Sequence, residues 1–74
     1  MTTSALQTVV QHIRGEYLES PGLRLTAWQI QRLWSLDESD CDVAVRMLLD
    51  ARFLREERDG TFSRNARGAR GAEN

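Results

Sequence analysis

The sequence predicts a mainly α domain that is built from three helices and completed by a small β-hairpin. Apolar residues recur at steps of three and four in three separate stretches, which is the period of a helix with one buried face. Further along, the pair Asp59-Gly60 separates two short stretches and is a strong local signal for a hairpin turn. We expect residues 1–64 to form one domain and residues 65–74 a disordered tail, because the tail has no large apolar residue to bury.

The first helix is predicted from Ala5 to Glu19. Its expected inner stripe consists of Leu6, Val9, Val10, Ile13, Tyr17 and Leu18. Ser4 is its expected N-cap, because Gln7 follows three residues later in the reciprocal capping arrangement. Pro21-Gly22 should end the helix, since the residue before a proline avoids helical backbone angles.

The segment after this helix predicts a short strand followed by a second helix. Leu23 and Leu25 alternate with polar neighbours over a stretch that suits an edge strand or an extended connector, which could pair with the later hairpin. Thr26 and Gln29 repeat the capping pattern and should open a helix from Ala27 to about Trp34. The expected inner positions of this helix are Ala27, Ile30, Leu33 and Trp34.

A third helix is predicted from the cap Asp37 to about Ala51, and the hairpin follows it. The inner positions of the helix should be Cys41, Ala44, Val45, Leu48 and Leu49. Asp59 and Gly60 are both expected to take positive φ in a tight turn. Phe53 and Phe62 should each face the core from opposite strands.

Composition argues against an enzyme, a cofactor and a metal site. Cys41 is the only cysteine, and no Cys or His residues are spaced to hold a metal ion. The sequence has no phosphate-binding glycine loop, and no nucleophile and base are spaced as in a catalytic motif. We therefore predict no catalytic residue and no small-molecule substrate. It also lacks a basic leader and any apolar run of the ~18 residues that a membrane span needs, which favours a cytoplasmic location.

Charge is distributed unevenly along a chain whose formal net charge is −1. Residues 35–50 hold five carboxylates and one arginine, whereas residues 51–74 hold six arginines and four carboxylates. The middle of the chain is therefore acidic, and its last third is mildly basic.

The stretch LTAWQIQRLWSLDESDCDVAVRMLLDARFLREERDGTFSR, residues 25–64, resembles a winged helix-turn-helix domain of the small bacterial type in its order of elements and apolar spacing. Leu36 would be the apolar anchor of the turn, while Ser35 and Arg52 stand where the family often has glycine. The resemblance implies a DNA-binding transcriptional regulator, as a dimer, whose third helix lies in the major groove and whose hairpin touches a neighbouring groove or phosphate.

The residues compatible with duplex DNA lie on the second helix, the third helix, the hairpin and the tail. They are Arg46, Ser39, Gln29, Arg32, Arg55, Arg58, Arg64 and Arg67. The start of the third helix opposes such binding, because each carboxylate held about 5 Å from a phosphate costs roughly 1 kcal/mol before screening. The acids there are Asp37, Glu38, Asp40 and Asp42. They either stabilise the helix start on a solvated face or form a surface tuned for a basic partner or against DNA.

A protein-interaction module that does not bind DNA is the alternative function. Trp28 falls outside the expected inner stripe of the second helix, and an exposed Trp is a common anchor of protein interfaces. Val9 and Tyr17 could extend the Trp28 surface into a homodimer or an interface with another protein.

Overall fold

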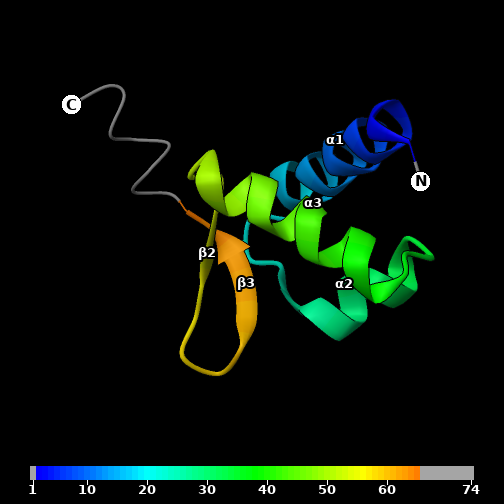
Figure 1. Ribbon diagram of the computed structural model, residues 1–74. Helices are drawn as coiled ribbons and strands as arrows, with labels where there is room; N and C mark the ends of the chain where they lie inside the picture. The colour runs from blue at the N-terminus through cyan, green and yellow to red at the C-terminus, as the bar shows by residue number, and fades with distance from the viewer. Residues whose placement is uncertain (1, 66–74) are drawn as a thin grey trace.

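The computed structural model describes residues 2–65, which form three helices packed on a small antiparallel sheet (Figure 1). The elements follow in the order α1 (Thr3–Glu19), β1 (Arg24–Thr26), α2 (Ala27–Leu33), α3 (Glu38–Asp50), β2 (Leu54–Glu56) and β3 (Thr61–Arg64). This is the arrangement of a three-helix winged helix-turn-helix, so the predicted fold class is confirmed. The hairpin of β2 and β3 projects beyond the helices (Figure 1).

Helix α1 begins earlier than the sequence predicted. Its N-cap is Thr2, whose hydroxyl accepts a hydrogen bond of 3.1 Å from the amide of Ala5. Ser4 lies inside the first turn, so the predicted cap formed by Ser4 and Gln7 is wrong. No helix within residues 2–65 is both long and apolar enough to cross a membrane.

Helix α2 begins at the predicted residue, but it buries fewer side chains than predicted. The hydroxyl of Thr26 accepts from the amide of Gln29 at 3.1 Å, and the Gln29 side chain accepts from the amide of Thr26 at 2.8 Å. Ile30 is fully buried, but Ala27 and Leu33 are exposed, so the predicted inner stripe is wrong at these two positions. A helix of two turns presents only a narrow strip to the core.

Two residues that are not glycine occupy left-handed backbone positions where helices end. Ser35 follows α2 with a φ of 52°, and Arg52 follows α3 with a φ of 60°. After α3, the amide of Phe53 donates to the carbonyl of Leu48, and the amide of Arg52 donates to the carbonyl of Leu49, both at 3.0 Å. This pair of bonds is the Schellman ending, which normally has glycine at its left-handed position. The two departures noted in the sequence therefore fall on real left-handed positions.

The sheet has the order β1-β3-β2, so the predicted edge strand pairs with the hairpin. The turn of the hairpin is wider than predicted. Glu57 and Thr61 close it through a backbone bond of 2.7 Å, and of its residues only Gly60 has a positive φ, at 88°. Asp59 instead accepts hydrogen bonds from the amide and the hydroxyl of Thr61, which fixes the turn through its side chain.

The core lies between the three helices and one face of the sheet. Its largest fully buried side chains are Ile13, Tyr17, Ile30, Leu48 and Leu54. The hydroxyl of Tyr17 donates a buried hydrogen bond of 2.7 Å to the carbonyl of Phe62, which ties α1 to the central strand. Burial raises the pKa of Tyr17 to about 12, against a smaller opposite effect from the backbone of Leu25. Leu36 is buried in the turn, as the sequence predicted.

The predicted boundary between domain and tail lies close to the end of the described residues. The amide of Asn65 donates to the carbonyl of Phe53 at 2.8 Å, so backbone pairing continues one residue past β3. The rest of the predicted disordered tail, residues 66–74, lies outside the residues that the structure describes.

Candidate functional site

The acidic start of α3 has the structural role that the sequence predicted. Asp37 is the N-cap, and its carboxylate accepts from the amide of Asp40 at 2.7 Å. Glu38 and Asp40 lie in the first turn, where the helix dipole favours negative charge.

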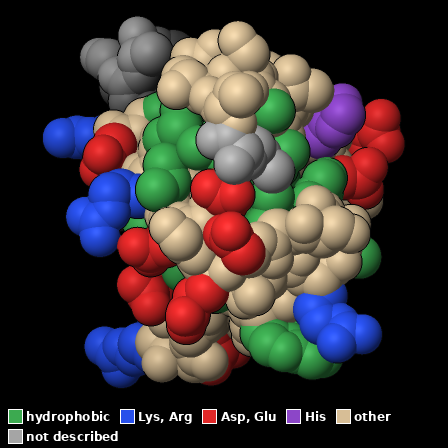
Figure 2. All heavy atoms as spheres, turned by 45° about the vertical axis from the view of Figure 1, so that its right-hand side comes forward, with side chains coloured by type: hydrophobic (Ala, Val, Ile, Leu, Met, Phe, Trp, Pro, Cys, Tyr) green, Lys and Arg blue, Asp and Glu red, His purple; other side chains and the backbone are tan. Residues whose placement is uncertain are grey.

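The exposed surface of α3 is poorly suited to a phosphate backbone. It carries the carboxylates of Glu38, Asp42 and Asp50 against the guanidinium of Arg46. Val43, 43% exposed, lies on the same surface. Figure 2 shows a group of acidic side chains near the middle of one face of the molecule, with arginine side chains toward its margins. A helix with this charge repels the polyanion that the family resemblance implies.

A groove of about 680 Å³ runs between α2, α3 and the central strand, and we call it the α2–α3 groove. Among the residues that line it are Trp28, Gln31, Glu38, Asp42, Val45 and Phe62. Its apolar surface comes from the exposed Trp28 and from core side chains such as Val45 and Phe62, and its acidic rim comes from the first turns of α3. The volume lies within the range of about 300–1,000 Å³ in which proteins hold ligands and side chains of partners.

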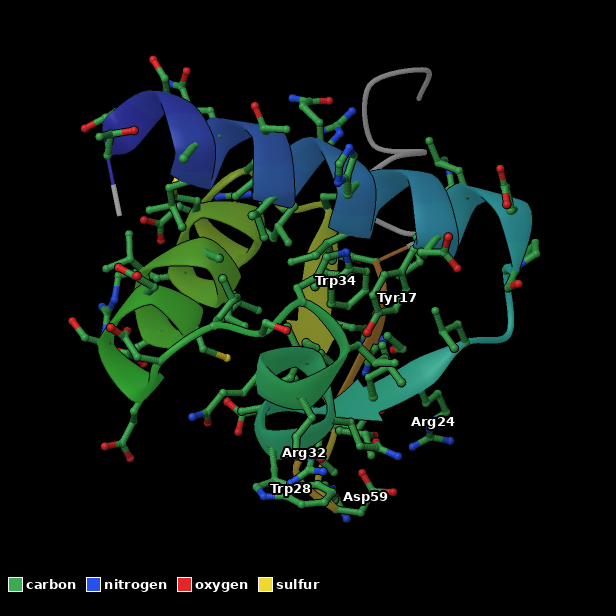
Figure 3. All side chains as sticks on the ribbon, turned by 90° about the vertical axis from the view of Figure 1, so that its right-hand side faces the viewer. Tyr17, Arg24, Trp28, Arg32, Trp34 and Asp59 are labelled. Carbon is green, nitrogen blue, oxygen red and sulfur yellow. The ribbon has the colours of Figure 1, made fainter. Side chains whose placement is uncertain are left out.

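Trp28 forms an exposed aromatic wall of the groove. Its side chain remains 64% exposed even though the guanidinium carbon of Arg32 lies 5.0 Å from the ring centroid. Both side chains lie together on α2, on the far side of this helix from Trp34 and α1 (Figure 3). The exposure of Trp28 is as the sequence predicted, and a Trp left on the surface in this way is a common interface anchor.

The carboxylates of Glu38 and Asp42 are one helical turn apart and both line the groove. Within residues 2–65, neither of them forms an ion pair. The groove therefore presents two carboxylates without an ion-pair partner among the described residues, together with an aromatic ring.

Ser39 and Cys41 also line the groove, in different environments. Ser39 is exposed at the rim, where its hydroxyl can donate or accept a hydrogen bond. Cys41 is buried, and its thiol donates to the carbonyl of Ala27 at 3.3 Å. Burial, with a smaller contribution from Asp42, raises the pKa of the Cys41 thiol, which makes this sulfur a poor nucleophile.

The predicted DNA-contacting residues of the hairpin lie in three different settings. Arg58 is exposed in the turn. Arg55 forms an ion pair of 3.4 Å with Glu57 on the same hairpin. Arg64 packs against Phe53, with its guanidinium carbon 5.9 Å from the ring centroid and its Nε buried without a hydrogen-bond partner among the described residues. The structure therefore does not bring these arginines together into one basic patch.

Arg24, which the sequence did not single out, lies beside the hairpin turn. It pairs with Asp59 at 3.4 Å (Figure 3), so this charge is also partly neutralised. The side-chain oxygen of Gln29 is engaged in the helix cap, while Arg46 is exposed on α3. Arg67 lies outside the described residues.

The three residues of the predicted partner interface do not form one exposed surface. Tyr17 is fully buried between α1 and the sheet, so its expected place in an exposed patch is wrong. Val9 is partly buried and packs against the core. Of the three predicted interface residues, Trp28 is the one with a large exposed side chain, and the groove beside it was not anticipated.

Comparisons of the chain with protein-family models, with curated proteins and with solved structures find no match.

Proposed function

We propose that this chain is a winged-helix module that docks a basic segment of a partner protein in the α2–α3 groove. The observation that carries the proposal is the meeting of an exposed Trp28 with the carboxylates of Glu38 and Asp42, which have no ion-pair partner among residues 2–65. A basic segment offers the opposite charge to the rim, and its apolar carbons can cover the ring and the floor. A buried free thiol at Cys41 is consistent with action in the reducing environment of the cytoplasm.

Both parts of the surface favour the same kind of ligand. Covering a Trp side chain removes a large apolar area from water. A Trp anchor of this kind contributes about 2 kcal/mol to the free energy of binding. A cation held at about 4 Å from a carboxylate gains roughly 1 kcal/mol in water-like dielectric and more where water is excluded. The same two carboxylates would oppose a phosphate group by a comparable amount, so the groove discriminates between polypeptide and nucleic acid through the sign of its charge.

The test is a titration of the ¹⁵N-labelled chain with a capped probe peptide of alternating Arg and Ala residues, followed by amide chemical shifts. We expect the largest changes at Trp28, Gln31 and Asp42, because these residues line the groove. Glu38→Gln combined with Asp42→Asn should weaken binding, whereas Val43→Ala, an exposed change on α3 outside the groove, should not. Changes confined to the hairpin, or none at millimolar peptide, would overturn the proposal.

DNA binding through the hairpin is the second candidate function. Its specific support is the exposed Arg58 at the tip of a projecting hairpin, together with the order of elements shared with winged-helix regulators. In this mode the hairpin, with Arg55 and the exposed Arg46 of α3, would follow the phosphate backbone, and a two-fold dimer would present two such hairpins.

Fluorescence anisotropy with a random duplex at several salt concentrations tests this second function. DNA binding predicts an affinity that falls steeply as salt rises, and a loss of affinity in Arg58→Gln. The double change Glu38→Gln with Asp42→Asn separates the two functions. It should strengthen DNA binding if α3 enters the major groove, and it should weaken peptide binding if the groove is the docking site.

A further inference from the structure

We infer that the α2–α3 groove is selective for arginine, whose guanidinium group would lie on the ring of Trp28 and pair with Glu38 and Asp42. This inference rests on the proposed docking function and deepens it by naming the group that is recognised. Its starting point is the chemistry of the groove, which combines an exposed aromatic face with two carboxylates one helical turn apart.

The molecule already contains the interaction that this inference requires. Arg32 stacks on Trp28, with 5.0 Å between the guanidinium carbon and the ring centroid. Arg32 is not among the residues that line the groove, so its stacking leaves the groove side of the ring available. Trp28 remains 64% exposed with Arg32 in place, which leaves part of its side chain available to an incoming cation.

A second aromatic residue shows that one ring in this chain can attract two guanidinium groups. The ring centroid of Phe53 lies 4.7 Å from the guanidinium carbon of Arg14 and 5.9 Å from that of Arg64. Two like charges are therefore tolerated around one ring in this chain. At Trp28 the two carboxylates of the groove would further offset the repulsion between Arg32 and a partner arginine.

Arginine fits this site better than lysine for reasons of shape and hydration. The guanidinium is planar, stacks on aromatic rings and presents a fork of N–H donors that can reach two carboxylate groups. Glu38 and Asp42 both lie on the rim and have no ion-pair partner among residues 2–65. The lysine ammonium is more strongly hydrated and cannot lie flat on the indole, so it would lose more on entering the groove.

The acidic rim makes a basic segment of another protein a better occupant than a second copy of this chain. The described residues of the chain carry more carboxylates than arginines, and two of the exposed arginines, Arg24 and Arg55, are paired with carboxylates. A second folded copy would therefore bring negative as well as positive charge to the rim. An unstructured segment with a single exposed arginine avoids this cost.

Three capped pentapeptides of the form Gly-Ala-X-Ala-Gly test the inference, where X is arginine, lysine or citrulline. Citrulline keeps the size and planarity of arginine and removes its charge. The readouts are the dissociation constants and the shift of the Trp28 indole N–H signal, which Trp28→Leu identifies by its disappearance. We expect the arginine peptide to bind about fivefold more tightly than the lysine peptide, since a difference of this size corresponds to a single exposed cation–π contact. The citrulline peptide should produce no saturable shift.

Variants separate stacking on the ring from charge pairing at the rim. Trp28→Leu keeps an apolar wall and should bring the ratio of the arginine and lysine affinities close to one. Glu38→Gln with Asp42→Asn should weaken both peptides, and Val43→Ala should leave both unchanged. Amide shifts away from the substituted residue report whether each variant retains the fold.

The possible failures are distinguishable. Equal binding of the arginine and lysine peptides in the groove would overturn arginine selectivity and leave the docking function standing. An absence of groove shifts with either peptide would overturn both proposals. Groove shifts that appear on raising the protein concentration without any peptide would identify a second copy as the occupant and would also overturn the inference.

Discussion

In two clusters of the described residues, an arginine guanidinium lies against an aromatic ring. The clusters differ in which other parts of the fold the ring contacts. Phe53, with Tyr17, Arg14 and Arg64, forms a cluster that joins α1 to the start of the hairpin. We call this the Phe53 cluster. Within residues 2–65, the guanidinium that lies over the Trp28 ring belongs to Arg32, one turn along the same short helix, and Trp28 remains largely exposed.

The difference teaches how to separate a structural aromatic residue from one available for binding. The Phe53 ring meets the Tyr17 ring edge to face at 6.4 Å, and Tyr17 in turn bonds to the central strand. Removing Phe53 would therefore loosen three elements at once. Removing Trp28 would disturb only the surface of α2, so its cost should appear in binding and not in folding.

The largest expected effect follows from Phe53→Ala. The substitution removes the edge-to-face contact with Tyr17 and exposes core side chains beneath the ring, so we expect the free energy of unfolding to fall by about 3 kcal/mol. Urea denaturation followed by circular dichroism measures this change. Leu33→Ala, which truncates a side chain that is 62% exposed, is the matched control and should change stability by less than about 0.5 kcal/mol. A similar result for the two variants would contradict the structural role of the Phe53 cluster.

Alkaline pH should weaken the same cluster through Tyr17. Because burial raises the pKa of this hydroxyl to about 12 in the folded chain, against about 10 when it is unfolded, the folded state holds its proton more tightly. The resulting stability is fully present below pH 10 and is lost as the pH rises toward 12, by roughly 2–3 kcal/mol in all.

Denaturation of the wild-type chain and of Tyr17→Phe at several pH values between 8 and about 11.5 measures this loss. The variant cannot ionise at this position, so it should lose less stability over the range, although it starts about 1 kcal/mol less stable without the bond to Phe62. Cys41 also has a raised pKa and destabilises both proteins in the same direction, so the comparison cancels its effect. Parallel pH profiles would show that the Tyr17 hydroxyl is not held in the buried, protonated form.

A smaller effect, and a stabilising one, is expected of Arg52→Gly. Arg52 has a φ of 60° at the end of α3, immediately before Phe53, and a side chain makes this left-handed conformation costly. Glycine removes this cost but adds freedom to the unfolded chain, so we expect a net gain of about 0.5–1 kcal/mol. Ser35→Gly, at a φ of 52°, is the matched change at the end of α2 and should give a similar gain. A loss of stability in both variants would show that the side chains at these positions stabilise the fold.

Most of the fold followed from local signals, although the local patterns misplaced the cap of α1 and the form of the hairpin turn. The capping box at Thr26, the cap at Asp37 and the period of α3 depend on residues close in sequence, and all three are present in the structure. Tyr17 has the spacing of a buried residue, yet the sequence alone also allowed it to lie in an exposed patch at the edge of the core. Its burial depends on packing against β3, which lies more than forty residues later in the sequence.

The candidate site divides in the same way. The exposure of Trp28 followed from the period of α2, and its stacking with Arg32 was within reach because the two residues are four apart on one helix. The groove was not accessible from the sequence, since Phe62 and Val45 reach it from elements that only the tertiary structure brings beside α2.

The smallest expected effect on stability belongs to Trp28→Leu, and it completes the comparison of the two rings. The indole is 64% exposed and its contact with Arg32 lies at the surface, so its replacement should change the free energy of unfolding by no more than about 0.5 kcal/mol. Urea denaturation of this variant beside the wild-type chain measures the difference. A loss as large as that expected of Phe53→Ala would mean that Trp28 holds α2 in place, and its exposed ring would then be part of the fold's own packing. A near-zero change in the free energy of unfolding would show that this large aromatic side chain does not stabilise the fold. Binding to a partner would then explain why it lies on the surface.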